Sequence, residues 1–315
     1  MILACGEALI DLFIFDRMGS RLACEAVAGG SPFNVAIGLA RLGRRVGFFG
    51  GLSTDSFGEF LASVLKDEGV DLSSAPRKSN LTTISVVATD GSGHPRYSFH
   101  GEQAADRMIT AADLPHPLPP NIEALTFGSF SLAVEPAASA YLALASRETS
   151  HRVISIDPNI RPTVIGDLTD YDRQLMKFIR TASVVKASQE DVALLYGADA
   201  AISAVAQLWL REGPALVVIT RGSEGAIAFQ QHHSIEMPGY TVNVIDTVGA
   251  GDSFHAALLA NLADTGDLTP ARIKNLPVDR LKLALQYAVA ASSITCSRRG
   301  ADLPTRKEVD AQVHQ

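Results

Sequence analysis

Short apolar runs alternate with helical patterns along most of the chain, and this alternation limits the folds that the chain can adopt. The runs are rich in Val, Ile and Phe and occupy residues 2–6, 45–50, 122–127, 153–157, 183–187 and 215–220. Helical patterns lie between most of them, at residues 33–42, 56–68, 136–149 and 200–212. Continuously apolar strands that alternate with helices are typical of a parallel sheet covered on both faces. The sequence therefore predicts an α/β fold, with a doubly wound, mostly parallel sheet flanked by helices.

Two segments break this alternation. Residues 11–28 and 81–100 mix polar and apolar positions, and a DGSGH turn interrupts the second segment at 90–94. This composition is typical of β-hairpins with one face in water. We expect segments of about 11–28 and 81–104 to form a small β-sheet that serves either as a lid or as a surface for homodimerisation.

Composition and charge exclude several classes of protein. The 315 residues are 47% hydrophobic and allow one large domain, and the net charge of -7 without a basic cluster argues against nucleic-acid binding. The three cysteines are odd in number and far apart, which predicts neither a disulfide framework nor a zinc site. The apolar N-terminus lacks a basic leader and contains two acids, and no uncharged span is as long as a membrane helix. We expect a cytoplasmic protein that binds neither membranes nor nucleic acid.

The stretch DTVGAGDSF at 246–254 indicates chemistry. It lies between the strand-like TVNVI at 241–245 and a helical pattern that we expect to begin at or near Asp252 or Ser253. Small residues before a helix leave backbone N–H groups free at the positive end of the helix dipole, which suits a phosphate. Asp252 is a favoured N-cap residue, and beside a phosphate it could instead accept the proton of an attacking hydroxyl. The catalytic residues predicted for phosphoryl transfer are Gly249, Ala250, Gly251 and Asp252.

Other nucleotide signatures are missing from the sequence. There is no GxxxxGK[ST] P-loop, and no GxGxxG follows a strand. The chain is therefore not expected to be a P-loop NTPase or a dinucleotide-binding enzyme.

Two motifs resemble a known family. DTVGAGDSF resembles the C-terminal signature of the ribokinase-like carbohydrate kinases of the phosphofructokinase B type, and GGSPFNVAIGLARLG at 29–43 resembles their N-terminal signature. The motifs occur in the family's order, and the resemblance extends from about residue 2 to about residue 306. It implies a single ribokinase-like kinase domain over residues 1–315, with ATP as phosphoryl donor and Mg²⁺ as cofactor.

The resemblance also implies which residues bind the sugar. The first strand and the glycine pair of the N-terminal signature match family positions that contact sugar hydroxyls. DPNIRP at 157–162 and HGEQAADRMI at 100–109 look similar to fructokinase-like members, although Arg161 could equally be a surface residue in a turn bounded by prolines. The substrate-binding residues predicted in this way are Asp11, Gly29, Gly30, Asn34, Phe99 and Arg161.

For the nucleotide, TRGSEGA at 220–226 resembles the family's Thr-x-Gly-x-x-Gly loop, although alone it would be an ordinary hairpin turn. KASQED at 186–191 departs from the family's Asn-x-x-Glu pattern, and Glu190 competes with Asp191 for the acidic position. The predicted cofactor-binding residues are Ser188, Asp191, Thr220, Gly222 and Gly225. RRGAD at 298–302 resembles a segment that, with Asp246 and Val248, holds potassium in many members.

The function predicted from these motifs is that of an ATP-dependent sugar kinase, with fructose as the preferred acceptor. A 2-keto-3-deoxygluconate kinase and a ribokinase or nucleoside kinase are the alternatives within this class. A sugar- or nucleotide-binding regulator without turnover is the alternative of another class.

Overall fold

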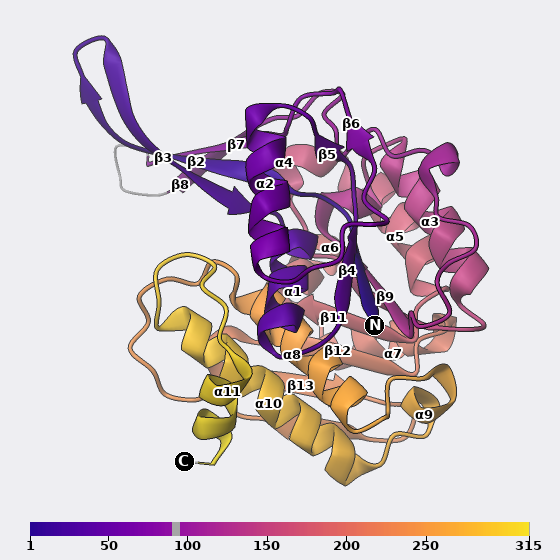
Figure 1. Cartoon of the computed structure of the whole chain (residues 1–315). Helices are drawn as coiled ribbons and strands as arrows, with labels where there is room; N and C mark the ends of the chain where they lie inside the picture. Colours follow the sequence, from indigo (N-terminus) through magenta and orange to yellow (C-terminus); the bar gives the residue numbers. More distant parts are fainter. Residues whose placement is uncertain (90–94, 315) are drawn as a thin grey trace.

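An eight-stranded sheet forms the centre of the computed structural model, which describes residues 1–89 and 95–314 (Figure 1). In sheet order, its strands are β14 (Ser234–Met237), β13 (Ala226–Phe229), β12 (Leu216–Thr220), β11 (Val184–Ser188), β10 (Val153–Asp157), β9 (Ala124–Gly128), β1 (Ile2–Cys5) and β4 (Val46–Phe49). Neighbours from β12 to β4 pair in parallel, and β13 and β14 extend one edge in antiparallel fashion.

Helices cover both faces of this sheet. One face carries α1 (Ser31–Arg41), α2 (Ser56–Asp67), α8 (Ala250–Asp264), α9 (Pro270–Lys274), α10 (Val278–Cys296) and α11 (Arg306–Val313). The other carries α3 (Ala137–Glu148), α4 (Pro162–Ile165), α5 (Leu168–Ile179), α6 (Gln189–Tyr196) and α7 (Ile202–Glu212). Short elements complete the chain: β5 (Leu52–Ser53), β6 (Arg77–Lys78), η1 (Ala111–Asp113), η2 (Ser129–Leu132) and η3 (Gly222–Glu224).

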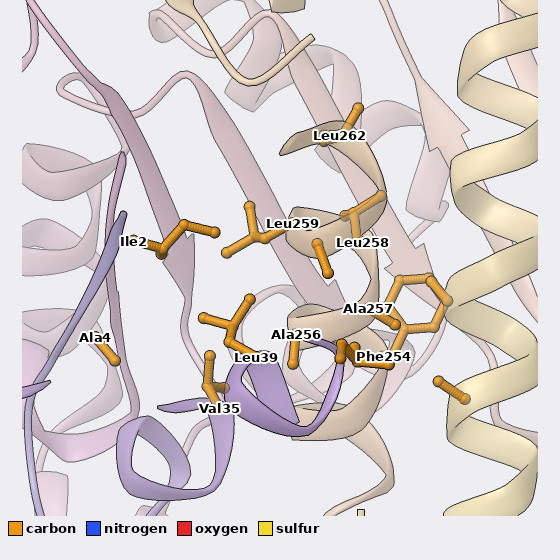
Figure 2. Close-up of a cluster of buried hydrophobic side chains, with 14 of the residues drawn as sticks. Ile2, Ala4, Val35, Leu39, Phe254, Ala256, Ala257, Leu258, Leu259 and Leu262 are labelled. Atoms are coloured by element: carbon orange, nitrogen blue, oxygen red, sulfur yellow. The ribbon is translucent and has the colours of Figure 1, made fainter. Parts of the chain in front are cut away.

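The two hydrophobic cores follow from the alternation of side chains along each strand. In β1, Ile2 and Ala4 belong to one core, whereas Leu3 and Cys5 belong to the other. Figure 2 shows the first core, where Ile2 lies near Leu39 of α1 and the side chains of α8. β1 is apolar at every position because it is buried on both faces, as a strand inside a doubly wound sheet is. The predicted doubly wound fold is confirmed.

A second, four-stranded sheet is built from the two segments that break the alternation. Its order is β3 (Arg21–Gly29), β2 (Leu9–Met18), β7 (Ile84–Thr89) and β8 (Pro95–His100). The β2–β3 hairpin extends away from the body of the protein (Figure 1). The predicted small sheet is therefore present, while the predicted DGSGH turn at 90–94 lies outside the described residues.

One local prediction is wrong, and one predicted helix start is two residues late. Residues 241–245 form no strand, because this segment lies beside the end of α10, where the Ile245 amide donates to the carbonyl of Cys296 at 2.8 Å. The helix after the turn begins at Ala250, before the predicted start, because the Ser253 amide already bonds to the Gly249 carbonyl at 2.8 Å.

Within the described ranges, no helix is both long enough and apolar enough to span a membrane.

Candidate active site

The candidate active site lies where the parallel strands end. Glu7 follows β1, Ser129 follows β9, and Asp157 is the last residue of β10. Ser188 and Thr220 end β11 and β12 in the same way. Ligands of open α/β sheets bind in the crevice outside the carboxyl ends of the strands. Polar residues from distant parts of the sequence therefore meet at one edge of the sheet.

The turn before α8 presents free backbone N–H groups at this edge. Gly249 is the N-cap of α8 and has a left-handed φ of 77°. A side chain there would be strained, and its Cβ would lie 2.7 Å from the Cβ of Ala301. Among the described residues, the amides of Gly251 and Asp252 donate no hydrogen bond. At the positive end of the dipole of α8, these two amides suit an anion.

Asp252 is buried beside the free amides, with 6% of its surface exposed. Its Oδ1 accepts a hydrogen bond from Ser31 Oγ at 2.6 Å, and its Oδ2 accepts one from Asn34 Nδ2 at 2.8 Å. Both donors lie on α1. Burial raises the pKa of Asp252, and the two hydrogen bonds oppose this rise. The carboxylate is thus held in one orientation and is more basic than an exposed aspartate, as a general base requires.

A cavity of about 510 Å³ lies on this side of the turn, and we call it the Asp252 cavity. The second sheet, α1 and the loop after β10 contribute to its walls. Val248 also lines it. The predicted catalytic and substrate-binding residues on its wall are Asp11, Gly30, Asn34, Phe99, Arg161, Gly249, Gly251 and Asp252.

Gly29 does not line the Asp252 cavity but makes room for a residue that does. A Cβ at Gly29 would lie only 2.4 Å from Oδ2 of Asp11 on the neighbouring strand. Burial raises the pKa of Asp11, while Ser85 and the charge of Arg161 oppose this rise. The glycine therefore allows the Asp11 carboxyl group to occupy its half-buried place.

A second cavity, of about 660 Å³, lies on the other side of the turn, and we call it the Thr220 cavity. Ala250 lines it from the turn. The predicted cofactor-binding residues all lie on its wall: Ser188, Asp191, Thr220, Gly222 and Gly225. The two cavities share three lining residues, Asn159, Thr247 and Gly251. They therefore meet at the free amides, so that a group bound there can be reached from both sides.

The two acidic candidates near Ser188 have different environments. Asp191 is buried, and its Oδ2 accepts hydrogen bonds from the amide and hydroxyl of Ser188 in a capping box. Its Oδ1 accepts from the Ile160 amide at 2.8 Å. Glu190 is exposed on the wall of the Thr220 cavity and makes no hydrogen bond among the described residues. The geometry therefore favours Glu190 for binding a cation and gives Asp191 a role in shaping the wall.

Asp246 lines neither cavity, and its carboxylate accepts two backbone hydrogen bonds near the turn before α8. Its Oδ1 accepts from the Val248 amide at 3.0 Å, and its Oδ2 accepts from the Gly300 amide at 2.8 Å. These bonds connect the turn to the RRGAD segment at 298–302. The potassium site expected here stays a prediction.

Four further residues at this edge were not among those predicted: Glu7, Ser31, Asp157 and Lys186. The sequence alone could indicate Glu7 and Lys186, because each is a charged residue inside an apolar run, and such a residue is rarely buried without a partner. Asp157 is the first residue of the DPNIRP motif, in which the sequence predicts only Arg161 as a site residue. No sequence pattern indicates that Ser31 belongs to the site, because its contact with Asp252 depends on how α1 packs against α8.

Comparisons with known proteins identify the family of this chain. The profile of the family described as pfkB family carbohydrate kinase matches residues 1–308. A fructokinase of Rhizobium leguminosarum bv. trifolii is 41% identical over 285 residues, which are 90% of this chain and 86% of that protein.

Solved structures of two bacterial enzymes resemble the chain. A fructokinase of Xylella fastidiosa with bound ATP has a TM-score of 0.91 at 28% identity, covering 99% of this chain and 98% of that chain. A fructokinase of Vibrio cholerae O395, bound to fructose, ADP and a calcium ion, has a TM-score of 0.82 at 28% identity with the same coverage.

Proposed function

The chain belongs to the pfkB family of carbohydrate kinases and is an ATP-dependent sugar kinase, and we propose that fructose is the sugar that it phosphorylates. The observation that supports phosphoryl transfer at this site is the meeting of two cavities at a pair of free amides, with one buried carboxylate beside them. The choice of fructose is supported by the fructokinase relative at 41% identity and by the Vibrio fructokinase solved with fructose and ADP.

In the proposed reaction, the sugar occupies the Asp252 cavity and ATP occupies the Thr220 cavity. Asp252 accepts the proton of a sugar hydroxyl, whose oxygen forms a bond to the γ-phosphorus while the bond from that phosphorus to the ADP oxygen breaks. The amides of Gly251 and Asp252 donate hydrogen bonds to the phosphoryl oxygens, where negative charge must be stabilised. Asp252 then returns the proton to solvent, and ADP leaves from the Thr220 cavity.

The sugar is oriented by groups on the opposite wall. Asp11 offers a carboxylate to its hydroxyls, and Gly30 offers close approach to the backbone. Asn34 uses its amide nitrogen on Asp252, which leaves its carbonyl oxygen available to a hydroxyl. Because a buried polar group without a partner is costly, a ligand rich in hydroxyls fits this wall better than an apolar one.

We propose two cations in this site. Mg²⁺ is commonly held by one or two carboxylates together with substrate phosphates, and the exposed Glu190 fits that arrangement. Among the described residues, no three His, Cys, Asp or Glu side chains group around a metal position, so the nucleotide would have to supply ligands. When bound, Mg²⁺ neutralises charge on the phosphates.

The second proposed cation is potassium, near Asp246 and Val248. Turnover measured in potassium chloride and in sodium chloride tests this proposal, which expects faster turnover in the potassium salt.

We propose that residues 1–315 form a single kinase domain in which segments 11–28 and 81–104 act as a lid. Asp11, Ser85 and Phe99 reach the Asp252 cavity from β2, β7 and β8. A lid over the sugar would exclude water, which otherwise competes as phosphoryl acceptor.

The outer part of the same sheet supports a homodimer. Phe15 and Leu22 of the β2–β3 hairpin are 57% and 58% exposed. Apolar side chains exposed together on an extended hairpin are typical of an interaction surface. Light scattering of the wild type and a Phe15→Ser variant tests this: the proposal expects a dimer that the substitution weakens.

We also propose the cytoplasm as the compartment of this enzyme. The chain has free cysteines that include the exposed Cys24, and a reducing compartment keeps such thiols intact.

The acceptor is tested by measuring ADP release from ATP with fructose, ribose, 2-keto-3-deoxygluconate and adenosine. We expect the highest kcat/KM with fructose. A higher value with another acceptor would reassign the substrate within the same site. A protein that binds ATP but releases no ADP with any acceptor would instead be a regulator.

A further inference from the structure

A buried ammonium group lies on the Thr220 cavity side of the turn. Lys186 is in β11 and is only 3% exposed, yet it lines the cavity. A Cβ at Gly251 would lie 3.0 Å from its Nζ, so the ammonium lies against the backbone that carries the free amides. Among the described residues lining the Thr220 cavity, Lys186 is the only cation, alongside the acids Glu190 and Asp191.

Asp157 keeps this ammonium charged. The Nζ of Lys186 donates to Oδ2 of Asp157 at 2.9 Å, and both side chains are buried. Burial by itself would lower the pKa of Lys186, but the attraction and hydrogen bond of Asp157 outweigh it, so the pKa is raised. Burial would likewise raise the pKa of Asp157, but Lys186 and His255 outweigh that effect and the pKa is lowered. Both partners are therefore ionised at neutral pH.

The ion pair lies where β10, β11 and α8 meet. His255 of α8 places its Nδ1 3.5 Å from Oδ2 of Asp157, and its Nε2 lies 2.7 Å from Oγ of Ser155 in β10. Because His255 follows Asp252 by three residues, the two lie about one turn apart on α8. The packing of α8 on the sheet therefore fixes the position of the Lys186 ammonium relative to the Asp252 carboxylate.

The ammonium also has unused capacity to donate hydrogen bonds. A lysine has three N–H donors, and among the described residues Asp157 is the one acceptor that Nζ reaches. Two donors therefore remain beside the cavity. A phosphoryl group held by the amides of Gly251 and Asp252 would present oxygen atoms to these donors.

We propose that Lys186 is a further catalytic residue, whose ammonium donates hydrogen bonds to the γ-phosphoryl group of ATP as that group moves to the sugar. This inference rests on the reaction proposed above. The sugar oxygen bonds to the γ-phosphorus, the bond to the ADP oxygen breaks, and Asp252 receives the hydroxyl proton, while Lys186 keeps its own protons. Its charge offsets the repulsion between the phosphoryl oxygens and the carboxylates of Asp157 and Asp252.

Lys186→Met removes the charge and keeps an unbranched side chain. We expect kcat to fall by about 100-fold or more, the scale for losing one donor to the transition state. We also expect ATP affinity to fall more than ADP affinity, because ADP lacks the γ-phosphoryl group. Lys177→Met, at an exposed lysine of α5, is the matched control and should leave both unchanged. A kcat within about 3-fold of wild type, or equal losses of ATP and ADP affinity, would overturn the proposal.

A second variant separates catalysis from folding. Lys186→Met leaves Asp157 as a buried, unpaired carboxylate, which can unfold the protein. The double variant Asp157→Asn/Lys186→Met removes both charges and should fold as the wild type does, while losing kcat to the same extent as the single variant. Recovery of turnover in the folded double variant would show that the pair is only structural.

A measurement on the unmodified enzyme needs no variant. The ¹⁵N signal of the Lys186 ammonium should shift more with ADP plus aluminium fluoride than with ADP alone, and equal shifts would refute the contact. These binding readouts require no acceptor. They therefore test Lys186 even if the wild type releases no ADP with fructose, a result that would refute the proposed acceptor instead.

Discussion

The Asp252 cavity and the Thr220 cavity share a wall but differ in what builds the rest of it. The Asp252 cavity takes side chains from both sheets, and its lining includes the carboxyl groups of Glu7, Asp11 and Asp252. Burial raises the pKa of all three. The Thr220 cavity lies between the ends of β11 and β12 and helices α8 and α10. Its lining combines glycines, hydroxyl-bearing and apolar side chains with Lys186 and the acids Glu190 and Asp191.

This difference indicates what each cavity can bind. Buried carboxyl groups are costly unless hydrogen-bond donors reach them, and the hydroxyls of a sugar are such donors. A wall of glycine backbone, one ammonium and apolar side chains suits a flat base with a chain of phosphates. We infer that the two sides of the turn bind different ligands, and single-residue variants test this division.

Asp252→Asn should have the largest effect, because Asn keeps the shape but cannot accept the proton. We expect kcat to fall by at least about 100-fold while fructose and ATP binding stay nearly unchanged. Steady-state kinetics and calorimetric binding measure the two quantities. Asp199→Asn, at an exposed aspartate before α7, serves as the control. Near-normal turnover would remove Asp252 from the role of base.

Glu7→Gln should change stability with a defined pH dependence. Burial raises the pKa of Glu7 to about 7, with hydrogen bonds from Ser131 and Ser129 opposing the rise. The folded protein thus holds this proton more tightly than the unfolded chain, so the free energy of unfolding falls as pH rises from about 4.5 to about 7.

Glu7→Gln has no ionisable group at this position, so its free energy of unfolding does not fall in this way as pH rises. It should exceed that of the wild type by up to about 3 kcal/mol above pH 7, with almost no difference below pH 4.5. Urea unfolding of both proteins at pH 4 and pH 8 makes the measurement. A variant that gains nothing at the higher pH would show that the carboxyl group is already satisfied when ionised.

Gly251→Val should disturb the wall that the cavities share. Its Cβ would lie 3.0 Å from Nζ of Lys186, so the added methyl groups would displace the ammonium and cover the free amides. We expect kcat to fall by roughly 10- to 100-fold, and the smaller Gly251→Ala to lose less. If both variants keep wild-type kinetics, the turn is only architectural.

Phe99→Ala should weaken binding in the Asp252 cavity and leave binding in the Thr220 cavity nearly unchanged. Phe99 meets Phe130 edge to face at 6.1 Å, and both line the Asp252 cavity. We expect KM for fructose to rise about 10-fold, while KM for ATP changes less than about 2-fold. Phe60→Ala, at a phenylalanine exposed on α2 and outside both cavities, is the control. A parallel rise in both KM values would contradict the division between the cavities.

Ser31→Ala should have the smallest effect, visible mainly in the pH profile. The Ser31 hydroxyl lowers the pKa of Asp252, so its removal should raise that pKa. A general base acts only when deprotonated, and the acidic limb of kcat/KM should therefore move to higher pH. At pH 8 we expect turnover within about 5-fold of wild type. Ser63→Ala on α2 is the control, and an unmoved acidic limb would exclude Ser31 from tuning the base.

The sequence predicted well those features that depend on neighbouring residues. The alternation of apolar runs and helices predicted the large sheet, and the family match confirms the predicted sugar kinase. The strand predicted at 241–245 is absent, since β-propensity there is overridden by contact with the end of α10. The capping box of Asp191 depends on Ser188 three residues earlier, a local pattern that could have been read as a helix start.

The local sequence predicts the components of the site: small residues before a long helix, an acid directly after them, and strands buried on both faces. Tertiary packing determines which distant groups meet there. Ser31 reaches Asp252 because α1 packs against α8, and Lys186 reaches Gly251 because β11 ends beside the same turn. Local patterns act through backbone geometry over a few residues, whereas these contacts depend on the register and packing of elements that lie far apart along the chain.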